Sequence, residues 1–149
     1  MRRATQTALI AFEHHVARGN LPVLANELCH ETAGKHTCDK RLSKTALSAS
    51  FPNVNYDAVV DEEDPYWGDG QTRESCLSLA QRAGAFADWL CARREERIAV
   101  VAHSGFLCAM MVAVLGVREG AHGGELGYAW FGTGELRTIR LTISPISAS

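Results

Sequence analysis

The apolar segment RIAVVAH at residues 97–103 constrains the fold more than any other part of the sequence. It is rich in β-branched residues and shows no polar alternation, which predicts a strand covered on both faces, as in a parallel sheet. Ser104 follows at once and is expected to cap a helix that runs to Leu115, with Gly116 as its C-terminal stop. A strand that leads directly into a helix favours an α/β fold.

The remaining apolar patterns predict further helices and strands in an order that fits a single α/β domain over residues 1–149. The expected helices cover residues 3–18, 42–49 and 72–96, and the expected strands cover residues 21–28 and 135–143. The last of these strands alternates in polarity, as a half-exposed edge strand does. Residues 29–70 are polar and irregular, and so long a connection in a compact domain is usually functional.

Composition and charge exclude several classes of partner and cofactor. The formal net charge of −2 gives no basis for binding nucleic acid or an anionic membrane. No apolar run reaches the roughly 18 to 20 residues that span a bilayer. Five cysteines without a secretion signal predict reduced thiols in a cytosolic protein. Cys29 and Cys38 lie near His30 and His36, but their spacing matches no standard zinc site, so we expect no metal and no cofactor.

His103 occupies the end of the predicted strand, where open α/β sheets bind their ligands. The backbone N–H groups of Ser104 and Gly105 would begin the next helix, and the positive end of its dipole would make an anion site beside the imidazole. Ser104 is not expected to be a hydrolase nucleophile, because AHSGF lacks the glycines of a G-x-S-x-G turn. A purely structural histidine at a strand end is the alternative interpretation.

Two charged segments could contribute to the same site. RRATQTA opens a helix with arginines, of which Arg3 could present its guanidinium to phosphate, although an exposed basic pair is the simpler interpretation. In ELCHETAGKHTCDKR, Glu27 and Glu31 follow a predicted buried strand, where a carboxyl group can serve as general acid. Lys40 and Arg41 could hold an acidic substrate. The alternative for this segment is a solvated loop of mixed charge.

Six segments, taken in order, resemble the histidine phosphatase superfamily, which is also called the phosphoglycerate mutase-like family. They are RRATQTA, ELCHETAGKHTCDKR, FPNVNY, DEEDPYW, RES and IAVVAHSGFL. The resemblance implies a three-layer α/β sandwich of the phosphoglycerate mutase-like type. It also implies hydrolysis of a small phosphorylated substrate through a phosphohistidine intermediate, with an acid that protonates the leaving alcohol and then activates water.

The same resemblance assigns roles to individual residues. Arg3 matches an arginine that binds phosphate, and His103 matches the second histidine, which clamps phosphate and transition-state charge. Glu31 is our candidate for the acid, ahead of Glu27. Phosphatase activity is favoured over mutase activity, because the CDKR loop does not resemble the usual mutase sequence after the acid. We therefore expect Arg3, Glu31 and His103 to converge on one pocket at the carboxyl ends of the strands.

The sequence departs from the family at its defining motif, since the 149 residues contain no Arg-His-Gly. The resemblance thus implies an incomplete sandwich in which the first strand with its nucleophile, the first helix and the second strand are absent. In the family the first strand lies beside the strand that carries His103, so its absence predicts an exposed sheet edge and possible self-association. Two functions stay open: a phosphomonoester hydrolase whose nucleophile segment lies outside this chain, and a non-catalytic phosphate-binding remnant or interaction protein.

Overall fold

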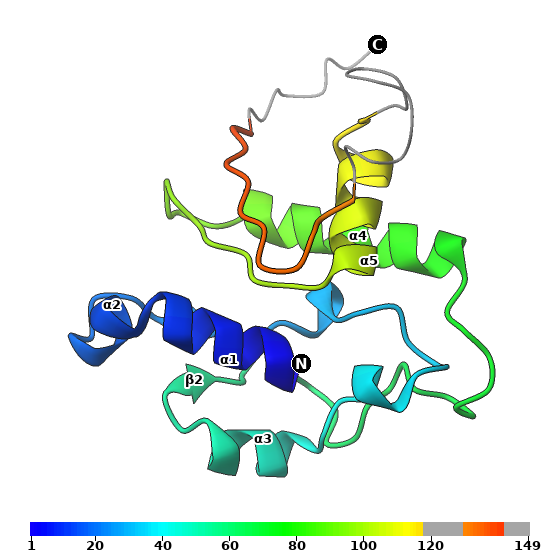
Figure 1. The fold of residues 1–149 in the computed structure, drawn as a ribbon, viewed down its shortest axis with the longest axis horizontal. Helices are drawn as coiled ribbons and strands as arrows, with labels where there is room; N and C mark the ends of the chain where they lie inside the picture. Colours follow the sequence, from blue (N-terminus) through cyan, green and yellow to red (C-terminus); the bar gives the residue numbers. More distant parts are fainter. Residues whose placement is uncertain (118–129, 142–149) are drawn as a thin grey trace.

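The computed structural model describes residues 1–117 and 130–141, in which helices and loops surround one short parallel sheet (Figure 1). The α-helices are α1 (Arg2–Ala11), α2 (Glu13–Ala17), α3 (Lys44–Ser50), α4 (Cys76–Cys91) and α5 (Ser104–Ala109). The strands are β1 (Val23–Leu24) and β2 (Val54–Asn55), and the shorter helices are η1 (Glu27–Cys29), η2 (Thr37–Asp39) and the π-helix η3 (Met110–Val114). Within these described residues, no helix is long and apolar enough to cross a membrane.

The sheet consists of β1 and β2, which pair in parallel with Val23 opposite Val54 and Leu24 opposite Asn55. Its apolar side packs against α3. The core formed there consists of Ala25, Leu47, Val54, Tyr56 and Val59. The helices and the parallel sheet support the α/β class, in the form of a partial domain with a small sheet.

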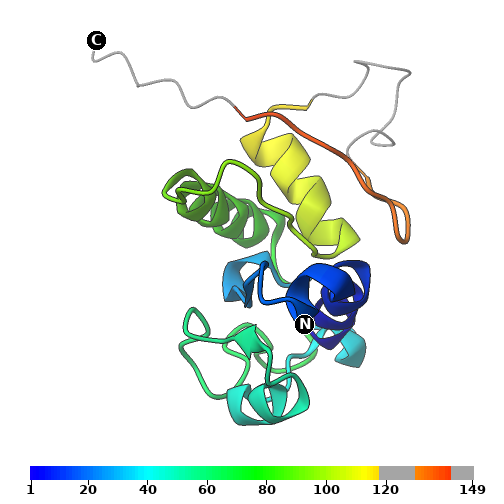
Figure 2. The same ribbon diagram turned by 90° about the vertical axis from the view of Figure 1, so that its left-hand side faces the viewer.

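A second core joins α4 to α5. Ser75 caps α4, because its Oγ accepts a hydrogen bond from the Ser78 N–H group at 3.1 Å. The rings of Phe86 and Phe106 meet edge to face with centroids 5.5 Å apart, and Ala83 completes the buried cluster. Figure 2 shows these two helices stacked on the side of the molecule away from α3.

Three expected helices form with shifted boundaries. The helix expected at residues 3–18 is divided into α1 and α2 at Phe12, whose φ of −115° leaves the helical range. The helix expected at residues 42–49 is α3, and Ser43 caps it because its Oγ accepts a hydrogen bond from the Ala46 N–H group at 3.1 Å. The helix expected at residues 72–96 is α4, which is shorter at both ends.

The helix expected after the 97–103 segment also forms, as α5 continued by η3. It ends before Gly116, whose φ of +63° is the left-handed conformation that favours glycine. The expected cap is wrong. His103 is the N-cap residue, Ser104 is the first helical residue, and the His103 side chain accepts no hydrogen bond from the helix.

Two of the expected strands are corrected by the structure. The strand expected at residues 21–28 is limited to β1, because the side chain of Asn26 accepts a hydrogen bond from the Leu28 N–H group and turns the chain into η1. The segment at residues 97–103 is not a strand. No N–H or C=O group of residues 97–102 has a backbone partner among the described residues, and a strand requires a neighbour.

The third expected strand, at residues 135–143, is absent from residues 135–141. A local cluster takes its place, in which the Arg137 guanidinium pairs with Glu135 at 2.5 Å and lies 4.0 Å from the centre of the Phe131 ring. Residues 142 and 143 lie outside the described residues.

Candidate functional site

The Glu31 side chain lies at the start of α5. Its Oε1 accepts hydrogen bonds from the N–H groups of Thr32 at 2.9 Å and Phe106 at 3.2 Å, and its Oε2 accepts one from Gly105 at 3.4 Å. A Cβ atom at residue 105 would overlap Glu31 Oε1, so glycine is what permits this approach. The three N–H donors hold the carboxylate at the start of α5. The Gly105 N–H group, which was expected to bind phosphate, is therefore occupied by the candidate acid.

His103 is half-buried directly before these N–H groups. Its Nε2 atom is buried and has no hydrogen-bond partner among the described residues. Burial lowers the pKa of His103, and the positive charges of the Met1 ammonium and Arg3 lower it further, whereas Glu31 and Asp39 raise it. The imidazole is therefore neutral near pH 7, and it can donate a hydrogen bond to a ligand or accept one from it.

Arg3 projects from the first turn of α1 onto the carboxylate of Asp39. Its Nη2 lies 3.1 Å from Asp39 Oδ1, and Arg73 Nη1 lies 4.0 Å from Asp39 Oδ2. Because Arg3 and Asp39 both act on the pKa of His103, this charge cluster belongs to the same region as the imidazole. Glu31 thus lies beside His103, whereas Arg3 contacts Asp39 and is linked to His103 only through the effect of its charge, and neither Arg3 nor Glu31 lines the cavity that His103 lines. Their catalytic and binding roles stay predictions.

Arg41 is placed differently from what the sequence suggested. It is buried, and its five N–H donors bond to the Glu27 carboxylate and to the carbonyl oxygens of Leu42, Asp61, Glu62 and Glu63. No donor is left for a substrate, so the assignment of Arg41 to substrate binding is corrected: it holds the loop together.

The same contact separates the two candidate acids. Burial raises the pKa of Glu27, while the Arg41 guanidinium beside it lowers this pKa. Glu27 is therefore the buried partner of Arg41, and Glu31 is the glutamate beside His103. The Lys40 ammonium lies 5.7 Å from the centre of the Trp67 ring, and no described contact joins Lys40 to Glu31 or His103.

His30 is a site residue that sequence reasoning assigned only to the loop. Its ring is buried 4.5 Å from the Tyr66 ring, and its Nδ1 bonds to the backbone oxygen of Glu31. Burial, with a smaller effect of Arg82, lowers the pKa of His30 to about 4. Its Nε2 has no partner among the described residues, and His30 lines the same cavity as His103. Across residues 1–117 and 130–141, no three His, Cys, Asp or Glu side chains are grouped so that they could hold a metal ion.

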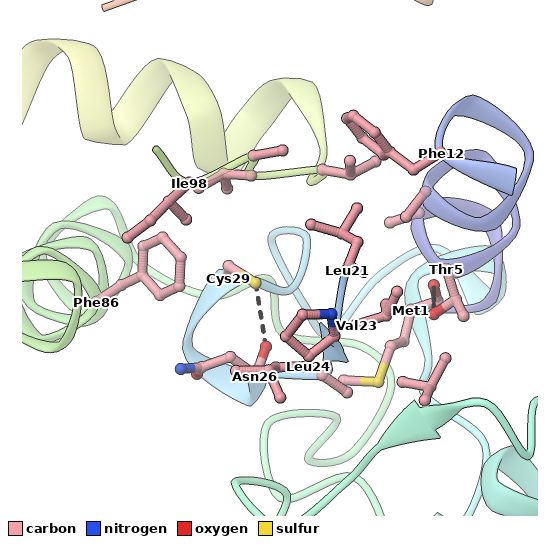
Figure 3. A pocket seen from close by; sticks show the side chains of 18 of the residues that line it. Met1, Thr5, Phe12, Leu21, Val23, Leu24, Asn26, Cys29, Phe86 and Ile98 are labelled. Carbon is pink, nitrogen blue, oxygen red and sulfur yellow. Dashed lines mark hydrogen bonds between the residues drawn. The ribbon is translucent and has the colours of Figure 1, made fainter. Parts of the chain in front are cut away.

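This cavity, of about 210 Å³, lies between α1, β1 and the segment after α4. Figure 3 shows Ile98 and Phe86 on one side, Phe12 and Thr5 on another, and Val23 and Leu24 below. Its lining is mostly apolar, and His30 and His103 contribute its imidazoles.

Unpaired backbone borders the cavity on two sides. On one side lie residues 97–102, which make no backbone hydrogen bond within the described residues. On the other side lies β1, in which successive residues direct their N–H and C=O groups to opposite edges. Ala25 donates to Asn55 in β2 at 2.8 Å, so Leu24 directs its groups away from β2 and towards this opening. We call the opening between β1 and residues 97–102 the strand groove.

Comparisons with known proteins agree with the family resemblance. The model of the histidine phosphatase superfamily (branch 1) matches residues 1–124. A phosphoglycerate mutase-like protein from Arabidopsis thaliana is 41% identical over 90 residues, which cover 60% of this chain and 33% of the relative. Phosphoglycerate mutase-like protein 1 from the same plant is 42% identical over 86 residues, covering 58% and 30%. A probable phosphoglycerate mutase from Arthroderma benhamiae is 29% identical over 94 residues, covering 62% and 28%.

The chain therefore spans about a third of the length of these curated relatives. No solved structure matches it. The matched family model covers residues 1–124, which include Arg3, Glu31 and His103, and identities near 40% support the same relationship.

Proposed function

We propose, because this chain belongs to the histidine phosphatase superfamily, that it carries the acid and the phosphate-binding groups of a phosphomonoester hydrolase. The observation that carries the proposal is the position of Glu31, whose carboxylate lies on the first N–H groups of α5, next to His103. An acid, an imidazole and an arginine in one region are what phosphoryl transfer to and from a histidine requires. Hydrolysis is favoured over mutase activity by the CDKR loop.

The nucleophile in this proposal is a histidine from a segment that these 149 residues do not include, since they contain no Arg-His-Gly. Its ring nitrogen forms a bond to phosphorus while the bond between phosphorus and the ester oxygen breaks. Glu31 gives its proton to that oxygen, and Arg3 and His103 stabilise charge on the transferring group. Glu31 then takes a proton from water, the water oxygen attacks phosphorus, and inorganic phosphate and the free histidine result.

Glu31 must change partners to do this. Its carboxylate oxygens accept hydrogen bonds from the N–H groups of Gly105 and Phe106, so they are held at the start of α5 and not on a leaving group. We expect a bound phosphoryl group to take over these donors, which releases the Glu31 carboxyl group towards the leaving oxygen. Gly105 and Phe106 then bind phosphate through their backbone N–H groups, together with Ser104, which the sequence predicted beside Gly105.

For the test, a segment with an Arg-His-Gly strand, taken from a longer relative, is joined to the N-terminus of this chain. Hydrolysis of an aryl phosphate by this joined protein is compared with hydrolysis by the 149 residues alone. We expect activity in the joined protein only. Glu31→Gln should reduce the rate about 100- to 10,000-fold, His103→Ala should reduce it strongly, and Glu96→Gln, at an exposed carboxylate, should leave it unchanged. Robust hydrolysis by the 149 residues alone that depends on His103 would overturn the proposal, because His103 would then be the nucleophile.

A second candidate function is a non-catalytic interaction protein that binds phosphate and one extended strand. The strand groove favours it, because unpaired backbone lies on both of its sides and its lining is apolar. Such a groove suits an added β-strand, whose main chain bonds to both edges. A joined protein that folds and binds phosphate but stays inactive would support this candidate over the hydrolase.

A further inference from the structure

We propose that Arg73 is a second anion-binding arginine of this site, and that Asp39 is an internal carboxylate that occupies the place of the ligand's phosphoryl group when no ligand is bound. The inference rests on the proposed function, since it concerns how the same site holds phosphate. The sequence assigned no role to either residue, although Arg73 lies in the RES segment and Asp39 in the CDKR loop.

The charge cluster has one buried acid between two exposed bases. The side chain of Asp39 is 7% exposed, whereas those of Arg3 and Arg73 are 61% and 41% exposed. Each arginine lies on a different carboxylate oxygen, at 3.1 Å and 4.0 Å. The two guanidinium groups therefore converge on a single anionic position.

The other arginines of this region show why Arg3 and Arg73 stand apart. Arg41 and Arg82 are buried and bond to several backbone carbonyl oxygens in addition to a carboxylate. Among the described residues, Asp39 is the only ion-pair partner of Arg3 and of Arg73. Most of their N–H donors are thus available to a ligand with more oxygen atoms than a carboxylate has.

Arg73 is held in this position by its neighbours along the chain. A Cβ atom at residue 34 would overlap the carbonyl oxygen of Thr72, so glycine at this position, with φ of +98°, lets the two segments touch. On the other side, the Glu74 N–H group donates to the Ala33 oxygen at 3.0 Å. Arg73 is therefore fixed against the segment that also carries Glu31.

Charge favours exchange of Asp39 for a phosphoryl group. Two guanidinium groups and one carboxylate leave a net positive charge, which attracts a dianion more strongly than a monoanion. A phosphoryl group also offers three oxygen atoms to two forked donors, whereas Asp39 offers two. Because Asp39 competes for the same donors, removing its charge should strengthen phosphate binding, and removing Arg73 should weaken it.

The test is a titration of the 149-residue chain with inorganic phosphate, followed by NMR at the Gly105 N–H and the Arg3 Nε–H signals. We expect Arg73→Ala to weaken binding about tenfold and Asp39→Asn to strengthen it about tenfold. Arg94→Ala is the matched control, because Arg94 is exposed and makes no ion pair within the described residues; it should change binding less than about twofold. Circular dichroism checks that each variant is folded, and Asp39→Ser replaces Asp39→Asn if that variant unfolds.

The outcomes separate this inference from the proposed function. Phosphate binding that depends on Arg3 but is no more sensitive to Arg73→Ala than to Arg94→Ala would overturn the inference and leave the proposed function standing. Weaker binding by both Asp39 variants would also overturn it, because Asp39 would then orient the arginines and not compete with phosphate. If neither the wild-type chain nor the Asp39 variants respond to phosphate, both proposals fail.

Discussion

His30 links the stability of the fold to pH, because its imidazole is buried in the neutral form. Burial, and to a smaller extent the charge of Arg82, lowers the pKa of His30 from 6.5 to about 4. A histidine with a lowered pKa binds protons more readily in the unfolded chain, so its contribution is complete above pH 6.5 and is lost as the pH falls towards 4. A shift of this size corresponds to about 3 kcal/mol.

Between pH 7.5 and pH 4, the free energy of unfolding of the wild-type protein should therefore decrease. We predict that this decrease is about 3 kcal/mol smaller in His30→Gln, as measured by urea unfolding at both pH values. His14→Gln serves as the control, since His14 is an exposed residue of α2, and it should keep the wild-type pH dependence. Equal pH dependence in His30→Gln and wild type would show that burial of this imidazole has no effect on stability.

Gly105 lets the Glu31 carboxylate approach the start of α5. Its replacement by alanine puts a Cβ atom where Glu31 Oε1 lies, so the carboxylate must leave the start of α5. We expect Gly105→Ala to lower the free energy of unfolding by about 1 to 2 kcal/mol and to shift the Phe106 amide signal in NMR spectra. Gly84→Ala is the matched control, because α4 leaves the space around Gly84 open; it should stabilise the protein by about 0.5 to 1 kcal/mol. A Gly105→Ala variant as stable as Gly84→Ala would contradict the observed position of Glu31.

The difference between Glu27 and Glu31 shows which part of the site a sequence can predict. Both glutamates follow the same apolar run, and spacing alone did not separate them. The separation comes from Arg41, which is buried on Glu27 and on carbonyl oxygens from residues 61–63. Such a contact between distant segments leaves no pattern in the local sequence. The start of the helix after His103 does leave one, which is the Ser-Gly pair.

At the scale of elements, helices were predicted better than strands for a physical reason. The start of α3 is encoded locally by Ser43, and the end of the helix after His103 is encoded by Gly116. A strand depends on a neighbour that can lie anywhere in the chain. Residues 97–103 have the composition of a buried strand but no neighbour among the described residues, so they form none.

The attachment of α4 to the site depends on Arg82. Its guanidinium pairs with Glu74 and donates to the carbonyl oxygens of Leu28 at 2.7 Å and His30 at 2.9 Å. We predict that Arg82→Leu lowers the free energy of unfolding by about 3 to 5 kcal/mol, because it leaves the buried Glu74 carboxylate unpaired. The burial of this pair makes the effect much larger than that of a surface ion pair.

The control is the double variant Arg82→Leu with Glu74→Leu, which removes both charges. We expect it to recover part of the lost stability in urea unfolding, since no charge is then left alone. A loss below about 1 kcal/mol in Arg82→Leu would mean that α4 is held by the Phe86–Phe106 contact without help from this ion pair.

At the scale of the whole molecule, two cores lie on either side of the strand groove. The core around β1, β2 and α3 is one body of packed residues, and the core of α4 and α5 is the other (Figure 1). The same groove carries His30 and His103 on its lining. A strand added there would have unpaired backbone on both sides, so we expect the proposed interaction function to use this opening.

The last prediction concerns what enters this opening when the 149 residues are alone. The groove leaves Leu24, Ile98 and Val100 partly exposed beside unpaired backbone, and such an edge favours pairing with another chain. We expect sedimentation velocity to show reversible association that increases with protein concentration. Val100→Lys should weaken it at least about tenfold, because a lysine at the edge opposes strand pairing. Val60→Lys is the matched control: Val60 is 83% exposed and does not line the groove, so its charge should leave association unchanged. A chain that stays monomeric throughout the micromolar range, or equal association of both lysine variants, would show that the open edges are not the contact.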